Sequence, residues 1–128
     1  MMSSIPFDWY ARRFVELSMS FEALAPMPIP RPPASDGRRA RIIEVAGRLA
    51  SRDDRFSAWA DAVGVPIATV SAVEQDDLEA ELDALVSRLY GLSRGQVEHV
   101  FATFHRGWDY GPRLEKVLGY FDALEGVE

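Results

Sequence analysis

The chain of 128 residues has no cysteine, only one lysine and only two histidines. Without thiols it can form neither a disulfide nor a thiolate zinc site, so we expect a protein of the reducing cytoplasm. The histidines, His99 and His105, are too few for a typical zinc site and lack the partners of a catalytic triad. The sequence therefore predicts no catalytic residue, no bound metal and no enzyme activity for this chain.

Long apolar runs are also missing. No run approaches the roughly 18 residues that a membrane helix needs. Acidic and aromatic side chains stand near the start, where a signal peptide would need an apolar stretch. A hydrophobic content of 48% with 27% charged residues is ordinary for a globular protein, and the length suits one domain. We expect a soluble cytoplasmic protein with no membrane partner.

The net charge of −6 is unevenly distributed. Residues 1–50 hold seven arginines and five acids, a balance of +2, whereas residues 51–128 hold seven basic and fifteen acidic residues, a balance of −8. A polyanion such as DNA is therefore expected to meet the first half of the chain. Almost all basic residues are arginine, whose planar guanidinium favours bidentate contacts.

Apolar periodicity predicts a mainly α-helical fold. Residues 6–17 form a short predicted helix with Pro6 in its first turn and one apolar stripe: Phe7, Tyr10, Phe14 and Leu17. The prolines between Pro26 and Pro33 exclude a helix or central strand and predict an extended segment. Strand-like alternation occurs only within residues 19–29. We expect residues 1–25 to be one element and residues 26–36 to be a linker.

Helix start and stop signals recur after residue 36. Ser35 or Asp36 can cap a first helix, Ser51 with Asp54 a second that ends at Gly64, and capping boxes begin two more. These boxes are Ser71 with Glu74 and Ser93 with Gln96, and Pro112 suits the first turn of a last helix. The apolar stripes are Ile42, Val45, Ala46, Leu49; Phe56, Trp59, Ala60, Val63; Leu78, Leu82, Leu85, Val86, Leu89; Val97, Val100, Phe101, Phe104; and Leu114, Val117, Leu118, Phe121. Residues 37–128 are thus predicted to form a bundle of four or five short helices.

Three groups of residues are candidates for binding. Arg12 and Arg13 stand beside Trp9 and Tyr10, a combination that suits a nucleic-acid backbone or a stacked base, unless the aromatic rings are core and the arginines solvated. Arg31, Arg38, Arg39 and Arg41 surround the start of a helix, where the dipole does not favour cations, so they suggest an anion site. In the loop at residues 105–110, Trp108 and Tyr110 either contact a partner or pack over the bundle while Asp109 caps the last helix.

The acid-rich run EQDDLEAELD, at residues 74–83, invites a catalytic interpretation. Glu79 and Asp83 are nevertheless predicted to lie on a solvated helix face, where nothing raises a carboxyl pKa. His99 falls between apolar positions of a predicted helix and is interpreted as structural.

Three segments in order resemble adenine-specific DNA methyltransferases of type II restriction–modification, BREX and DISARM phage-defence systems. Residues 3–32 resemble the end of the target-recognition region, where a short helix leads to a strand and a proline-rich exit. The matching residues are Ser4, Phe7, Asp8, Tyr10, Arg12, Phe21, Pro26, Pro28 and Pro30. Residues 38–65 are similar to the helices after that exit, and Glu81 to Leu92 match the signature ELDALVxxLYGL.

The resemblance implies a share in DNA recognition without catalysis. The family's Gly-containing S-adenosylmethionine motif and its Asn-Pro-Pro-Tyr or -Phe adenine motif are both missing, and the chain has no asparagine. This chain is therefore expected to bind no cofactor itself, with S-adenosylmethionine held by a separate catalytic part. The expected partners are that methyltransferase subunit or domain, and DNA through the complex. The resemblance favours Arg12, Arg13 and Arg31 as DNA-facing residues, with Arg38 and Arg39 as further candidates.

Two interpretations remain open. In the first, the chain is a non-catalytic C-terminal segment of such a methyltransferase, with an exposed apolar patch for the recognition domain formed by Ile5, Phe7, Trp9 and Phe21. In the second, it is an independent helical interaction module or regulator, closed on itself with those residues buried. The predicted protein contacts are Phe7, Trp9, Phe21, Trp108 and Tyr110.

Overall fold

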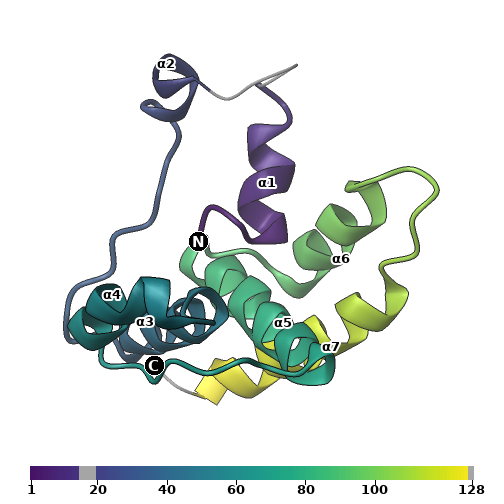
Figure 1. The fold of residues 1–128 in the computed structure, drawn as a ribbon. Coiled ribbons are helices and arrows are strands. Elements are labelled where there is room, and N and C mark those ends of the chain that lie inside the picture. Colours follow the sequence, from purple (N-terminus) through teal and green to yellow (C-terminus); the bar gives the residue numbers. More distant parts are fainter. Residues whose placement is uncertain (15–19, 127–128) are drawn as a thin grey trace.

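The computed structural model describes residues 1–14 and 20–126, and every regular element within them is helical (Figure 1). This confirms the predicted mainly α-helical class. The elements in chain order are α1 (Ile5–Ala11), α2 (Phe21–Leu24), α3 (Gly37–Ala50), η1 (Asp54–Phe56), α4 (Ser57–Val63), α5 (Ala72–Leu89), α6 (Arg94–Thr103), α7 (Gly111–Ala123) and η2 (Leu124–Gly126). None of the helices in this part of the chain combines the length and apolarity needed to cross a bilayer.

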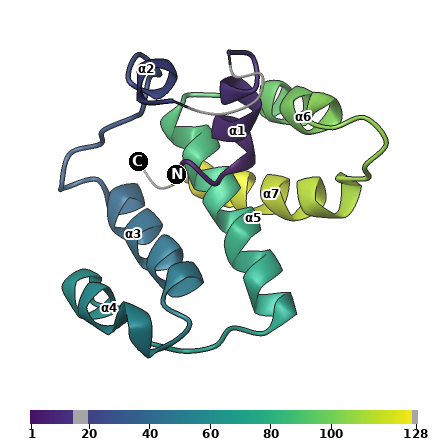
Figure 2. The same ribbon diagram turned by 45° about the horizontal axis from the view of Figure 1, so that its top comes forward.

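Helix α5 is the centre of the fold, with α7 packed on one side and α3 on the other (Figure 2). Its alanines, Ala80 and Ala84, are fully buried beneath α6 and α7, in a cluster with Val97, Val100, Phe101, Val117 and Phe121. Its leucines and Val86 instead form a second cluster with Ile42 and Val45 of α3. Because both faces are covered, α5 is buried around most of its circumference from Leu82 to Ser87, as expected for a central helix.

Most predicted caps are confirmed. Asp36 caps α3 by accepting a hydrogen bond from the Arg38 backbone N–H, and Ser71 caps α5 in the same way through the N–H of Glu74. The capping box at Ser93 and Gln96 is complete, with hydrogen bonds in both directions. The five α-helices between Gly37 and Ala123 agree with the predicted four or five.

The second predicted helix differs in its start and in its orientation. Asp53, not Ser51, provides the cap, because a turn of 3-10 helix (η1) precedes α4. Only Ala60 of the predicted stripe is buried, whereas Phe56 and Trp59 are 42% and 43% exposed. The spacing predicted the stripe, but among the described elements α4 contacts chiefly α3 and η1, so only one of its faces is covered.

The N-terminal helix is shorter than predicted. It ends at Ala11, so Phe14 lies beyond it and is 62% exposed, while Leu17 is outside the described residues. Instead of the strand implied within residues 19–29, the chain forms the helical turn α2, where Ser20 Oγ accepts a hydrogen bond from Ala23 N–H. From Pro28 to Pro33 no regular secondary structure forms, in agreement with the prediction.

Candidate functional site

A buried carboxylate fixes the position of α1. Asp83 of α5 is 1% exposed, and it accepts hydrogen bonds from the Ile5 backbone N–H at 2.8 Å and from the Arg113 guanidinium at 2.8 and 3.1 Å. Burial raises the pKa of Asp83 to about 6, although Arg113 and Ile5 act against this shift. The prediction that Asp83 lies on a solvated face is wrong, because α1 and α7 cover this part of α5. Glu79, one turn earlier, is only half-buried and pairs with Arg113.

Arg12 joins α1 to the loop between α6 and α7. Its guanidinium pairs with Asp8 one turn earlier at 3.0 Å and reaches His105 Nε2 at 3.0 Å. It also lies over the Phe104 ring, 4.9 Å from the centroid. The other nitrogen of His105 is 3.0 Å from the Tyr110 hydroxyl. Residues about 93 positions apart in the sequence thus form one continuous polar and aromatic cluster.

Arg13 and Trp9 form a second part of the same cluster. The Arg13 guanidinium stacks over the Trp9 ring at 4.4 Å, in the geometry of a cation–π contact. The indole N–H of Trp9 donates to Thr103 Oγ1 at 2.9 Å, which ties α1 to the end of α6. Among the described residues, Arg13 forms no salt bridge with a carboxylate, and its guanidinium lies against the Trp9 ring.

The loop at residues 104–110 carries two further exposed groups. Trp108 is 72% exposed, and its ring centroid lies 6.0 Å from that of His105. Arg106 is exposed, and no hydrogen bond or ion pair joins it to the described residues. Asp109 accepts a hydrogen bond from the N–H of Gly111, the first residue of α7, but the N-cap residue of that helix is Tyr110 and not Asp109 as predicted. The predicted packing over the bundle holds for Tyr110, which packs on the α5–α7 cluster, but not for Trp108, which is exposed.

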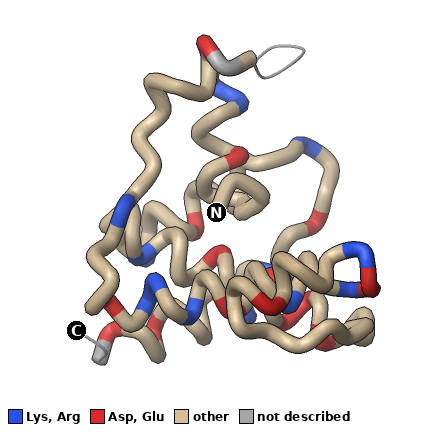
Figure 3. Tube along the Cα trace, turned by 60° about the vertical axis from the view of Figure 1, so that its left-hand side comes forward, with Lys and Arg blue, Asp and Glu red and all other residues tan. Residues whose placement is uncertain are grey.

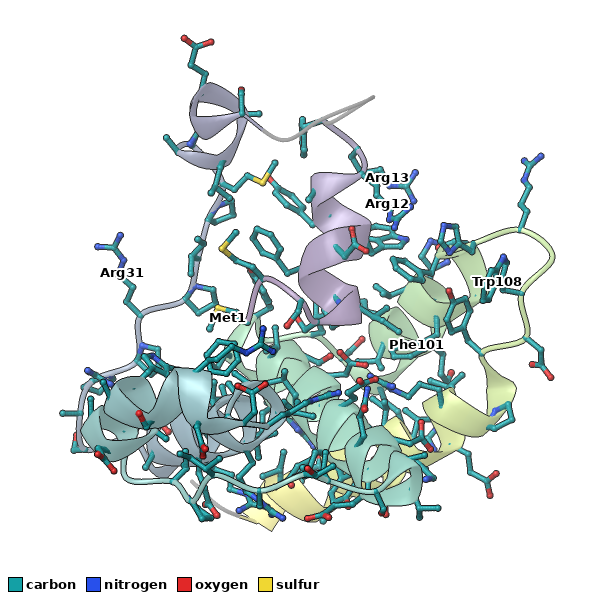
Figure 4. The ribbon with its side chains drawn as sticks, viewed as in Figure 1. Met1, Arg12, Arg13, Arg31, Phe101 and Trp108 are labelled. Atoms are coloured by element: carbon teal, nitrogen blue, oxygen red, sulfur yellow. The ribbon has the colours of Figure 1, made fainter. Side chains whose placement is uncertain are left out.

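We use the name α1–loop surface for Trp9, Arg12, Arg13, Arg106 and Trp108. Figure 4 shows Arg12, Arg13 and Trp108 on the same side of the molecule. The surface combines aromatic rings with arginines, two of which, Arg13 and Arg106, have no acidic partner in the described residues. The sequence predicted the two segments separately as binding candidates, and Arg106 belonged to the loop at residues 105–110 but not to the predicted DNA-binding arginines. No local signal indicates that this loop meets α1, because the contacts of Arg12 with His105 and with the Phe104 ring depend on the tertiary packing.

The other predicted arginines lie elsewhere. Arg31 projects from the proline-rich segment, on the opposite side of α1 from Arg12 and Arg13 (Figure 4). Arg38 forms a bidentate pair with Asp36, and Arg39 donates a hydrogen bond to the Pro32 carbonyl at 3.3 Å. The structure therefore divides the five predicted DNA-binding arginines into two separate groups.

The predicted apolar contact residues also separate. Phe7 is 1% exposed and packs with Ala11 and Met27, so its assignment as a surface contact is wrong: the proline-rich segment covers it. Ile5 and Trp9 are half-buried against the α5–α7 cluster. Phe21 begins α2, and its side chain lies outside the described part of the structure.

Charges of both signs are interleaved over the fold. Figure 3 shows lysine and arginine positions on several elements, with aspartate and glutamate between them. Most basic side chains pair with acids, as in the network of Arg113 and Lys116 with Asp76, Asp77 and Glu79. A basic stripe that could follow a nucleic-acid backbone for a long distance is not seen in the described residues.

Comparison with protein-family models, with curated proteins and with solved structures finds no match for this chain. Among the residues that the structure describes, no group of three or more His, Asp or Glu side chains is arranged to hold a metal ion. The α1–loop surface supplies exposed arginines and an exposed indole ring. Such groups can bind an anion and stack on a planar base or side chain.

Proposed function

We propose that the chain is a non-catalytic segment of a DNA adenine methyltransferase, and that it contacts DNA locally through the α1–loop surface while a separate catalytic part holds S-adenosylmethionine. The observation that carries the proposal is that α1, where Arg13 stacks on Trp9, is joined through Arg12 and His105 to the loop that holds the exposed Trp108, although the two segments are far apart in the sequence. The methyltransferase part of the proposal rests on the resemblance of the three sequence segments. Arg13 and Arg106 provide the phosphate contacts, and the exposed Trp108 ring provides stacking.

The charge balance limits how this contact can work. The chain has a net charge of −6, and only two arginines of the α1–loop surface lack an acidic partner among the described residues. The isolated chain should therefore bind DNA weakly, because each phosphate contact releases only about one counterion. In the complex, the catalytic part adds the remaining phosphate contacts. DNA binding is therefore expected from the complex and not from the chain alone.

The experiment is co-expression with the product of a neighbouring reading frame that contains the Asn-Pro-Pro-Tyr or -Phe motif. We expect the two proteins to purify together, and the complex to bind a DNA duplex with an affinity that falls as salt rises. The chain alone, measured under the same conditions, should bind at least about a hundredfold more weakly. Sequence-specific DNA binding by the isolated chain, or the absence of any such complex, would contradict the proposal.

The burial of Phe7 favours a second candidate function, an independent helical interaction module. Phe7 is covered from within the chain, and Ile5 and Trp9 are half-buried, which is the arrangement expected of a closed unit. For this candidate, the chain alone should be a folded monomer or a symmetric dimer that unfolds cooperatively in urea. Sedimentation of the untagged chain, together with urea unfolding, tests it. Aggregation of the isolated chain, or a non-cooperative transition, would argue against an independent module.

A further inference from the structure

A second surface lies on the opposite side of α1 from the α1–loop surface, where the proline-rich segment passes over α3 and the end of α5. Pro30 and Pro32 line one side of a groove with a volume of about 350 Å³. Ile42 and Ile43 of α3 and Leu89 of α5 line the other side. The volume is at the lower end of the roughly 300–1,000 Å³ typical of ligand pockets, and it gives room for an apolar side chain.

The apolar part of this groove is open to an incoming group. Ile43, which lines the groove, is 41% exposed, although its neighbour Ile42 is almost buried at 9%. An exposed isoleucine on its own needs no explanation, but exposed apolar side chains around a concave site are typical of a binding surface. The prolines restrict the backbone of one side, so an occupant would lose little free energy to ordering that side.

Two guanidinium groups border the same groove. Arg31 has no hydrogen bond or ion pair with the described residues, and Arg39 makes only the long hydrogen bond to the Pro32 carbonyl. Nine of the chain's fourteen basic side chains form salt bridges with carboxylates in the described part of the structure. Arg31 and Arg39 therefore offer uncompensated positive charge at the border of an apolar groove.

We propose that this groove binds a short acidic, apolar peptide segment of a partner protein. A leucine or phenylalanine of the peptide fills the space over Ile43 and Leu89, and neighbouring aspartate or glutamate side chains pair with Arg31 and Arg39. Arginine suits this role because its planar fork binds a carboxylate through two hydrogen bonds. A buried apolar anchor surrounded by polar pairs is the usual anatomy of a protein interface.

Duplex DNA fits this groove less well. Phosphates would satisfy the two arginines, but the polar sugar–phosphate backbone has nothing to fill an apolar space, and most protein–DNA hydrogen bonds go to that backbone. The α1–loop surface, in contrast, offers a stacking ring beside its arginines. The inference about the groove is independent of the proposed DNA contact, since the two surfaces share no residue.

The test uses the full chain labelled with ¹⁵N and a panel of fluorescein-labelled short peptides that carry leucine or phenylalanine between aspartates and glutamates. Matched peptides replace the acids with asparagine and glutamine, or with lysine. We expect the acidic peptides to bind and to shift the amide signals of Ile42, Ile43 and Leu89, with the neutral and basic peptides at least about tenfold weaker. Binding of no acidic peptide, or equal binding of the neutral set, would overturn the proposal.

Variants make the test specific. Arg31→Glu/Arg39→Glu should weaken binding of the acidic peptides at least about tenfold, and Ile43→Glu should do the same by removing the apolar contact. All three side chains are exposed, so circular dichroism should show an unchanged fold for both variants. Arg106→Glu is the matched control, because it reverses an exposed arginine outside the groove and should leave peptide binding unchanged. Loss of peptide binding in Arg106→Glu would overturn the assignment to this groove.

Two further measurements exclude other occupants. If Arg31→Glu/Arg39→Glu weakened DNA binding of the methyltransferase complex while peptide binding stayed the same, the groove would be part of the DNA contact and the proposal would be wrong. If sedimentation detected a dimer of the chain that this variant abolished, the occupant would be a second copy, which would also contradict a partner peptide. A failed DNA contact at the α1–loop surface would change neither result, so the two proposals can fail separately.

Discussion

Asp83 provides the sharpest test of how the fold is held together. The carboxylate is almost fully buried between α1, α5 and α7, and burial raises its pKa to about 6 despite the hydrogen bonds from Arg113 and Ile5. Its ordinary pKa in an unfolded chain is close to 3.8. Between about pH 4 and pH 6, the folded chain therefore binds more protons than the unfolded chain at this residue.

The sign of the effect on stability follows from this difference. Where the folded state binds more protons, the free energy of unfolding falls as pH rises. The contribution of Asp83 to stability is thus largest below about pH 4 and is lost as pH rises through about pH 6. One pKa unit corresponds to about 1.4 kcal/mol, so the loss over this window is at most about 3 kcal/mol.

The variant Asp83→Asn isolates this contribution. Asparagine cannot ionise, and its amide oxygen can still accept the hydrogen bond from the Ile5 N–H. It has no second oxygen to accept the hydrogen bonds from Arg113. The change gives a constant cost from the lost Arg113 contact and a pH-dependent gain. We expect the variant to become more stable relative to the wild type, by up to about 3 kcal/mol, between pH 4 and pH 7.

Urea unfolding followed by tryptophan fluorescence, at several pH values from 4 to 7, measures this difference. Asp76→Asn is the matched control on the same helix, since hydrogen bonding to Lys116 lowers the pKa of Asp76. Because the pKa of Asp76 is lowered below 3.8, the effect of that variant on stability should change only below about pH 4 and stay nearly constant between pH 4 and pH 7. A difference for Asp83→Asn that is as constant with pH as that of the control, or that falls as pH rises, would refute the reasoning about burial.

Five further substitutions test the packing and the caps by urea unfolding. Phe7→Ala removes a 1% exposed ring that packs with Ala11 and Met27, and should cost about 3–5 kcal/mol; a cost below about 1 kcal/mol would mean that α1 is not docked as described. Ser93→Ala breaks the capping box of α6 and should cost about 1 kcal/mol of stability. Ser71→Ala removes the N-cap of α5 and should have a similar cost. Gly64→Ala places a side chain on a backbone in the left-handed region at φ 72° and should cost about 1–2 kcal/mol of stability. Gly37→Ala is the control, because the backbone of Gly37 is not left-handed, and it should cost less or stabilise the protein. Equal effects of the two variants would contradict the left-handed cap.

Local signals explain which parts of the fold could be predicted. The caps at Asp36, Ser71 and Ser93 act through atoms within three residues, so the sequence contains all the information that they need. The end of α4 at Gly64 is likewise local, because only glycine adopts its backbone conformation without strain. The helical class and the number of helices after residue 36 followed from these signals together with apolar periodicity.

Tertiary contacts explain the predictions that were wrong. Asp83 has the spacing of an acidic helix face, but Arg113 is 30 residues away and Ile5 is 78 residues away, and only their packing buries the carboxylate. Trp59 has the spacing of a core residue, yet α4 has too few neighbours to cover it.

The candidate site shows the same limit. Trp9, Arg12 and Arg13 were predicted as one group and the loop at residues 105–110 as another, but no pattern in the sequence indicated that His105 would connect the two groups. A hydrogen bond across 93 positions depends on where α6 ends relative to α1. The sequence likewise did not predict that Arg31 and Arg39 lie on a different surface from Arg12 and Arg13.

The most direct test of the proposed DNA contact is the salt dependence of DNA binding by the methyltransferase complex that contains Arg13→Gln/Arg106→Gln. Each lost phosphate contact should reduce the slope of log affinity against log salt by about 0.9, so this variant should reduce it by about 1.8. Arg52→Gln, the change of an exposed arginine outside the α1–loop surface, should leave the slope unchanged. An unchanged slope and affinity in the double variant would contradict the account.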